Sequence, residues 1–214
     1  MRVTLVHYLP LNIEEFISSI MRRTRDPREI EELKESVQSR DGWVERLVKL
    51  AVDSSFSPNS GHYSVLEHVV YTFEASEVSR VLTHQLVRHR VASYVQLSGR
   101  VHNSRKMIVP PCDYLDAEAR TKARSIFSEI EQLAAEKYGR LLELGVRVED
   151  ARYGLPFGQD TIIIITMNAR SLMHFLRLRM SPYAQWEIRE LASKMYELVK
   201  PTAPLLWEKI PNDI

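Results

Sequence analysis

The amino-acid sequence predicts an α+β fold that is rich in helices and built around a small sheet. Asp116–Leu144 and Ala184–Val199 carry apolar residues at helical spacing, whereas Val3–Tyr8 and Thr161–Met167 are short and rich in β-branched residues. The chain has 214 residues, enough to bury one sizeable core, and shows no repeat, low-complexity segment or linker. We therefore expect residues 1–214 to form a single domain.

The elements follow one another along the chain with recognisable boundaries. Helices are expected over Leu11–Arg22, Pro27–Ser39, Trp43–Val52, Glu77–His89, Asp116–Leu144, Asn168–Arg179 and Ala184–Val199. Strands are expected over Val3–Tyr8, Val69–Phe73, Lys106–Val109 and Thr161–Met167, and loops over Ser54–His62 and Arg90–Asn103. Asp26 suits the N-cap of the second helix with Pro27 as its first residue, and Gly145 suits the end of the long helix.

The overall composition is that of an ordinary globular protein. The formal net charge is +1, which argues against a general nucleic-acid or membrane-surface binder. A single cysteine, Cys112, excludes an internal disulfide and fits a reducing compartment. The longest apolar run is far shorter than the roughly 20 residues of a spanning helix, and the first residues lack the apolar core of a signal peptide. These features predict a cytoplasmic protein.

The charges are nevertheless unevenly placed along the chain. No acidic residue lies between Glu77 and Asp113, although that stretch carries five arginines and a lysine. A second acid-free stretch lies between Asp160 and Glu187 and contains three arginines. Segregation of this kind predicts a localised anion site on an otherwise neutral surface.

Polar side chains interrupt the apolar faces of two predicted helices. Gln85 and His89 fall within the stripe of Glu77–His89, and Arg179 falls on the apolar side of Asn168–Arg179. An arginine is seldom buried without a partner, and no acid lies near Arg179 in the sequence. Two ordinary explanations stay open, because Arg179 can extend to solvent or pair with a distant carboxylate, and Gln85 and His89 can be hydrogen-bonded core residues.

Other kinds of site have little support. His62, His68, His84 and His89 lack the spacing of a metal-binding motif, so no metal is expected. Cys112 follows two prolines with no adjacent histidine, which favours an unreactive thiol. No glycine-rich phosphate loop is present, so a nucleotide would have to be bound by arginines and side-chain donors.

The basic segment itself matches a specific motif. Arg88-His89-Arg90, followed after seven residues by Ser98-Gly99-Arg100, resembles the signature of flavin-dependent thymidylate synthases. Three further blocks of that family have counterparts in the same order. They are residues 62–68 (HYSVLEH), 151–156 (ARYGLP) and 168–188 (from NARSL to AQWEI). The family fold, helices around a small antiparallel sheet, agrees with the elements expected above.

The resemblance implies the site residues. The dUMP-binding set would be Gln85, Leu86, Val87, Arg88, Gln96, Leu97, Ser98, Gly99, Arg100, Arg152 and Arg179. The FAD-binding set would be Ser64, Arg88, His89, Arg90, Gln96, Asn168, Ala169, Arg170 and His174. Arg179 would be catalytic, because a fixed guanidinium beside the uracil favours ionisation at N3 and stabilises developing charge.

The resemblance also implies the reaction and the assembly. dUMP would be methylated to dTMP, with methylenetetrahydrofolate as the carbon donor and NADPH as the reductant of the flavin. The family members are homotetramers whose active sites draw on several subunits. The expected partners are therefore small molecules and further copies of the chain, with neither nucleic acid nor membrane.

Two other classes of function remain open from the sequence. The basic loop 88–105 suits a single-stranded nucleic-acid binding module in which Tyr94 and His89 stack on bases. Such a module would bind no flavin, and its affinity would fall steeply with salt. A regulatory or structural oligomer that keeps the motif without turnover is the other class, and it would bind flavin or dUMP without forming product.

Overall fold

The computed structural model of the protein describes residues 1–56, 62–101, 104–208 and 210. Most of the loop expected over Ser54–His62, and residues 102–103 of the basic loop, lie outside the described residues. Four strands, β1 (Arg2–Leu9), β2 (Val70–Ser79), β3 (Ser93–Gln96) and β4 (Asp160–Asn168), form an antiparallel sheet in the order β1-β2-β4-β3. The predicted helix-rich α+β class is confirmed. Within the described ranges, no helix combines the length and the apolar character needed to cross a bilayer.

The chain divides into two compact units, and every strand contributes residues to both. Unit 1 contains residues 1–2, 75–88 and 95–163, and unit 2 contains residues 3–74, 89–94 and 164–214. The helices of unit 1 are α4 (Arg80–Leu86), α5 (Ala117–Glu143) and α6 (Val148–Ala151), with the short turn η2 (Arg152–Gly154). The helices of unit 2 are α1 (Ile13–Arg23), α2 (Ile30–Gln38), α3 (Trp43–Phe56), α7 (Ala169–Arg179), α8 (Trp186–Val199) and α9 (Pro204–Trp207), with the short turns η1 (Tyr63–His68) and η3 (Lys200–Thr202).

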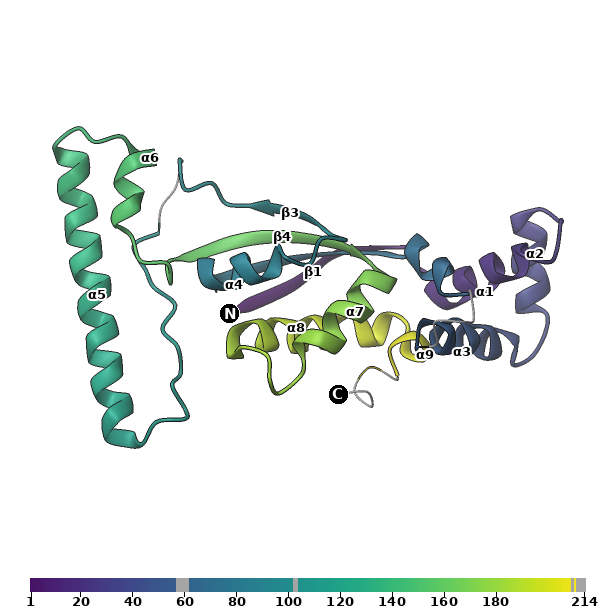
Figure 1. Cartoon of the computed structure of the whole chain (residues 1–214). Helices are drawn as coiled ribbons and strands as arrows, with labels where there is room; N and C mark the ends of the chain where they lie inside the picture. Colours follow the sequence, from purple (N-terminus) through teal and green to yellow (C-terminus); the bar gives the residue numbers. More distant parts are fainter. Residues whose placement is uncertain (57–61, 102–103, 209, 211–214) are drawn as a thin grey trace. The chain divides into compact units, whose positions relative to one another are not determined.

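Unit 2 is centred on the aromatic side chains of β2. Tyr71 and Phe73 are fully buried with ring centroids 6.3 Å apart, and Trp207 packs edge-on against Tyr71. The Trp207 indole N–H donates to the Tyr71 hydroxyl at 3.1 Å, which satisfies a polar group inside this core. Figure 1 shows α7 and α8 side by side along one face of the sheet, and α1, α2 and α3 grouped together.

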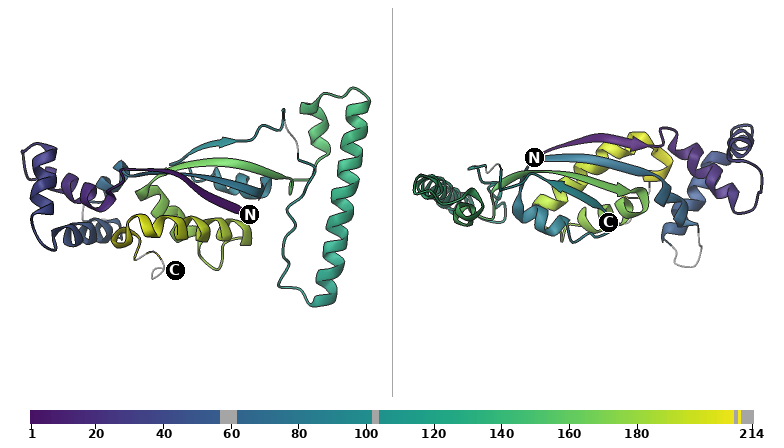
Figure 2. Two further views of the ribbon diagram at one scale, coloured as in Figure 1. Left: turned by 180° about the vertical axis from the view of Figure 1, so that it is seen from behind. Right: turned by 90° about the horizontal axis from the view of Figure 1, so that it is seen from above.

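Unit 1 is dominated by the long helix α5. Asp116 caps its first turn by accepting from the Ala119 N–H at 2.8 Å, and Gly145, at φ +82°, lies just beyond its end. The predicted helix over Asp116–Leu144 is therefore confirmed as one unbroken helix. The views in Figure 2 show α6 running beside α5, and Tyr138 is the one residue of α5 that is buried.

Four local predictions are wrong. The strand expected over Lys106–Val109 does not form, because that segment makes only an isolated antiparallel bridge between Met107 and Gln159. The helix expected over Glu77–His89 is shorter, because β2 continues to Ser79, whose hydroxyl caps α4 by accepting from the Leu82 N–H. Asp26 does not cap α2; its carboxylate binds the guanidinium groups of Arg22 and Arg28 instead. Residues 93–96, expected in a loop, form β3.

Candidate functional site

The predicted site residues divide between the two units. Those expected to bind dUMP lie in unit 1, except for Arg179, and those expected to bind FAD lie in unit 2, except for Arg88 and Gln96.

Most of the unit 1 residues lie in the last residues of α4 and β3 or directly after these elements. Leu86 is buried in the last turn of α4, Gln85 is half-buried, and Val87 and Arg88 are exposed just after the helix. The backbone N–H of Leu97 donates to the Ile162 carbonyl at 2.9 Å, extending the pairing of β3 with β4 by one residue. Gln96 donates weakly from Nε2 to the Thr161 hydroxyl at 3.4 Å.

A turn after β3 presents the serine of the motif. The Val101 N–H donates to the Ser98 carbonyl at 3.2 Å, and the Arg100 N–H donates to the Ser98 hydroxyl at 3.3 Å. Gly99 is buried beneath the turn, whereas the side chains of Ser98 and Arg100 are exposed. The backbone thus fixes this turn while leaving both side chains accessible to a ligand.

The unit 1 arginines that are expected to bind dUMP have few partners. Among the residues that the structure describes, no hydrogen bond or ion pair engages the guanidinium of Arg88 or Arg100. Arg152 is half-buried and donates from Nε to the Glu149 carbonyl at 3.0 Å. Burial and the neighbouring charge of Arg152 both lower the pKa of Arg80. Arg80 carried no specific motif in the sequence, and its closeness to Arg152 emerges only from the fold.

His89 is the centre of the unit 2 group. Its Nε2 lies 2.6 Å from the Ser171 hydroxyl, which in turn donates to the Val91 carbonyl at 2.5 Å. Because the hydroxyl has one hydrogen and a carbonyl can only accept, Ser171 accepts from His89, so the ring carries its hydrogen on Nε2. The His174 and Phe175 rings lie 5.7 and 5.5 Å from the His89 ring. Burial is the main cause of the lowered pKa of His89, and the charges of His174 and Arg179 add to it, whereas the Ser171 contact opposes it.

The position of His89 corrects an expectation from the sequence. His89 does not belong to the apolar stripe of a helix, because α4 ends at Leu86. It packs against α7 instead. Tyr94 donates its hydroxyl to the His89 carbonyl at 2.8 Å and is half-buried. Both rings proposed as stacking platforms for nucleic-acid bases are therefore engaged within unit 2.

The start of α7 holds three more of the predicted residues. Asn168 caps the helix through its side-chain oxygen, which accepts from the Ser171 N–H at 2.8 Å, and Ala169 is buried. Arg170 pairs with Glu67, and its guanidinium lies 3.8 Å above the Tyr63 ring. Ser64, from the same short turn as Tyr63, is exposed.

The last turns of α7 carry His174 and Arg179. His174 is exposed, and Arg179 is half-buried on the side of the helix that buries Leu172 and Phe175. Among the described residues, no carboxylate pairs with Arg179. Its location on the apolar side of α7, expected from the sequence, is confirmed.

Comparisons with known proteins identify the family. The family model described as "Thymidylate synthase complementing protein" matches residues 4–205. The chain belongs to this family. Proteins named flavin-dependent thymidylate synthase are 47% identical over 152 residues in Saccharolobus solfataricus and 48% identical over 159 residues in Sulfurisphaera tokodaii. A third, from Clostridium tetani, is 36% identical over 225 residues.

The three matches cover different shares of this chain and of the relatives. The matches cover 69%, 72% and 97% of this chain and, in the same order, 56%, 60% and 85% of the relatives. The chain thus spans less than two thirds of the first two relatives. The resemblance to flavin-dependent thymidylate synthases, inferred from the motif at Arg88–Arg100, is confirmed.

Proposed function

We propose that the protein is an enzyme that methylates dUMP to dTMP, with methylenetetrahydrofolate as the carbon donor and NADPH as the reductant. The observation that carries the proposal is the motif from Arg88 to Arg100, in a chain that the family model matches over residues 4–205. The dTMP product and the soluble substrates also fit the predicted cytoplasmic location.

Unit 1 supplies groups suited to the nucleotide. The phosphate of dUMP is a dianion, and planar guanidinium groups bind phosphate oxygens through two parallel hydrogen bonds. Arg88 and Arg100 are exposed and without described partners, so no ion pair has to be broken when they bind. The exposed hydroxyl of Ser98 adds a neutral donor in the same turn as Arg100.

Unit 2 supplies groups suited to a flavin. FAD contains a pyrophosphate and a large planar ring, which require cationic donors and a firm surface. Arg90 is exposed with no described partner, and Arg170 lies on the surface at the start of α7. The half-buried ring of His89 provides the firm surface, and the fully buried ring of Phe175 packs edge-on against it. These residues fit FAD, which when bound would pass hydride from NADPH to the pyrimidine.

Arg179 is proposed as the group that activates the pyrimidine. Arg179 projects from the side of α7 that buries Leu172 and Phe175, so its backbone is fixed by packing and needs little reorganisation when a substrate arrives. A fixed positive charge favours the ionised form of uracil N3 and stabilises charge that develops during the reaction. Ser98 and Cys112 take no chemical step in this proposal.

We also propose that the protein forms the homotetramer with shared active sites that the resemblance implies. Along α5, Ile126, Ile130 and Leu133 recur at helical spacing and are exposed by 56%, 42% and 55%. An exposed apolar row of this kind is the mark of an association surface. Light scattering of the purified protein, with Ile130→Glu as the disrupting variant, measures whether α5 contributes to assembly.

The proposed reaction is tested by spectroscopy and by omission of each reactant. We expect purified protein to show flavin absorbance bands after incubation with FAD. dTMP should form with dUMP, NADPH and methylenetetrahydrofolate, and omission of any of them or of FAD should stop it. Product in the absence of flavin, or a protein that binds no flavin but binds single-stranded nucleic acid, would exclude the proposal.

A further inference from the structure

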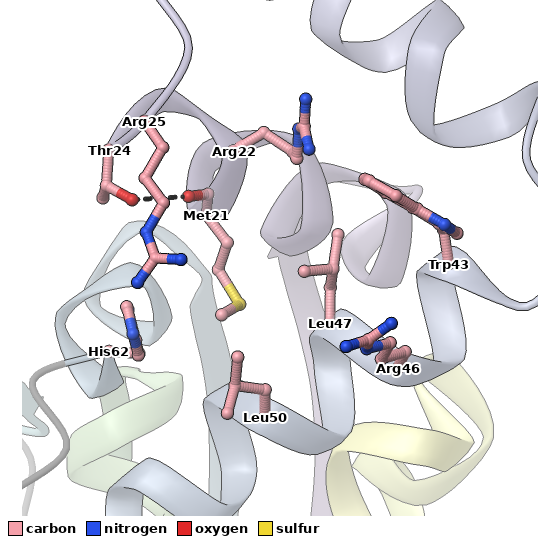
Figure 3. Close-up of a pocket in the computed structure, with 9 residues that line it drawn as sticks. All are labelled: Met21, Arg22, Thr24, Arg25, Trp43, Arg46, Leu47, Leu50 and His62. Carbon is pink, nitrogen blue, oxygen red and sulfur yellow. Dashed lines mark hydrogen bonds between the residues drawn. The ribbon is translucent and has the colours of Figure 1, made fainter.

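A cavity in unit 2 lies outside both sets of predicted site residues. Its volume is about 290 Å³, and it is formed by the end of α1, by α3 and by His62 (Figure 3). The residues that line it are Met21, Arg22, Thr24, Arg25, Trp43, Arg46, Leu47, Leu50 and His62. A space of this size is at the lower end of small-molecule sites, so it suits a fragment rather than a whole dinucleotide.

One part of the lining is apolar and firmly placed. Figure 3 shows the side chain of Met21, on α1, extending toward Leu50 on α3. Leu47 lies close by, also on α3. The Trp43 ring has the guanidinium of Arg40 at 4.4 Å and that of Arg22 at 4.8 Å from its centroid. An ordered indole beside aliphatic side chains favours a flat apolar group in the ligand.

The rest of the lining is cationic, and only part of that charge is neutralised. Arg22 pairs with Asp26 at 2.8 Å. The pKa of Asp26 is strongly lowered, mainly by its hydrogen bond to Arg28. By contrast, no ion pair involves Arg25 or Arg46 in the part of the chain that the structure describes.

The carboxylate that adjoins Arg46 in the sequence has another partner. Glu45, next to Arg46, is bound by Lys49 at 2.6 Å. Figure 3 shows the Arg25 guanidinium directed toward His62 at one side of the cavity, and none of the nine described residues that line the cavity is acidic. Arg25 and Arg46 therefore offer an uncompensated guanidinium group on each side of the apolar wall, and each can bind anionic oxygens of a ligand.

We propose that this cavity binds a planar ring joined to a dianionic group. Two substrates of the proposed reaction contain such a fragment. The p-aminobenzoylglutamate tail of the folate has a benzene ring and two carboxylates, and the adenosine half of NADPH carries a 2′-phosphate. The choice between these sources rests on the proposed function, whereas the ring-plus-dianion chemistry follows from the lining residues alone.

Titration calorimetry on the full-length protein tests the site without turnover. The probes are p-aminobenzoyl-L-glutamate, adenosine 2′,5′-bisphosphate and inorganic phosphate. We expect one of the two ring-bearing probes to bind saturably at one site per chain and the bare phosphate to bind far more weakly. The probe that binds shows whether the folate or NADPH supplies the fragment that occupies the cavity. Affinity should fall as salt is raised, because the guanidinium groups are partly exposed.

Matched variants locate the binding. Arg25→Gln and Arg46→Gln each remove one uncompensated guanidinium, and each should weaken the ring-bearing probe by about tenfold or more. Arg23→Gln is the control, because Arg23 is exposed on the same helix and donates to the backbone carbonyls of Pro27 and Arg28 outside the cavity. It should change the affinity by less than about twofold, since its charge is screened.

Trp43→Leu keeps both arginines and tests the ring-binding half. It should weaken the ring-bearing probe while leaving phosphate binding unchanged, and circular dichroism reports whether each variant is folded. The proposal is overturned if neither ring-bearing probe binds, or if Arg25→Gln and Arg46→Gln bind as tightly as Arg23→Gln. It is equally overturned if phosphate binds as tightly as the ring-bearing probes. Failure to form dTMP would count against the proposed reaction but would leave these binding results intact.

Discussion

The predicted nucleotide residues of unit 1 and the predicted flavin residues of unit 2 are held in different ways. In unit 1, backbone hydrogen bonds fix the turn at Ser98, while the guanidinium groups of Arg88 and Arg100 are exposed and without described partners. In unit 2, His89, Asn168 and Arg170 already make specific side-chain contacts. Substitutions of the exposed unit 1 residues should therefore affect mainly ligand binding, whereas substitutions of His89, Asn168 and Arg170 should also affect stability.

Arg179→Ala should have the largest effect and tests the one nucleotide residue that lies in unit 2. Loss of a charge-stabilising group in a dry site costs about 3–4 kcal/mol, so dTMP formation should fall by about a hundredfold or more. The fold and flavin binding should persist, because Arg179 has no described ion pair. Steady-state turnover and flavin absorbance measure the two effects, and near-normal turnover would remove Arg179 from the catalytic role.

Ser98→Ala should act on dUMP affinity alone. A hydrogen bond to a charged group contributes about 1.5–3 kcal/mol, so the Kd for dUMP should rise by about tenfold to a hundredfold. The thermal midpoint should hardly change, since the hydroxyl is exposed and accepts only a weak bond from the Arg100 N–H. Equilibrium binding and thermal denaturation give the two values. Loss of all activity with dUMP still bound would point to a chemical role for the serine.

His89→Gln should lower stability as well as flavin affinity. The hydrogen bond to Ser171 contributes about 0.5–1.5 kcal/mol to the free energy of unfolding. The pKa of His89 lies below its ordinary value of 6.5 in the folded protein, chiefly because of burial. The unfolded chain therefore takes up the proton first, and stability due to the neutral ring is present above about pH 6.5 and declines as the pH falls below it.

Urea denaturation between pH 5 and 8 measures this dependence. The wild-type protein should lose more stability on acidification than His89→Gln, which has no titrating ring at this position. Parallel pH curves for the two proteins would show that His89 does not titrate as described.

Cys112→Ser should have the smallest effect and separates this chemistry from a thiol mechanism. The thiol is buried and lies near the Tyr114 hydroxyl, so a substrate has little access to it. We expect the variant to keep most of its dTMP formation, measured with all four reactants present. A folded but inactive variant would favour a catalytic cysteine.

Sequence reasoning succeeded where the signal was local. Asn168 marks the start of α7 and Asp116 the start of α5, because a capping side chain needs only the backbone two or three residues ahead. It failed where a distant partner decided the outcome. Asp26 binds arginines instead of capping α2, and β3 forms by pairing with β4, more than sixty residues away in the chain.

The candidate site shows the same limit. The family motif predicted His89 as a site residue, yet its contact with Ser171, 82 residues away, appears only in the fold. Arg80 went unnoticed because its neighbour Arg152 belongs to another element. The cavity around Trp43 was missed for the same reason, since α1 and α3 contribute to it from separate parts of the sequence.

The division between the two units is tested most directly by two matched arginine variants. Arg100 in unit 1 and Arg90 in unit 2 are both exposed and have no described partner, and each is replaced by glutamine. Dissociation constants for dUMP and for FAD are then measured separately. Arg100→Gln should weaken dUMP by about tenfold or more with little change for FAD, and Arg90→Gln should do the reverse. Equal losses of both ligands in both variants, or no loss in either, would contradict the assignment of Arg100 to the nucleotide and of Arg90 to the flavin.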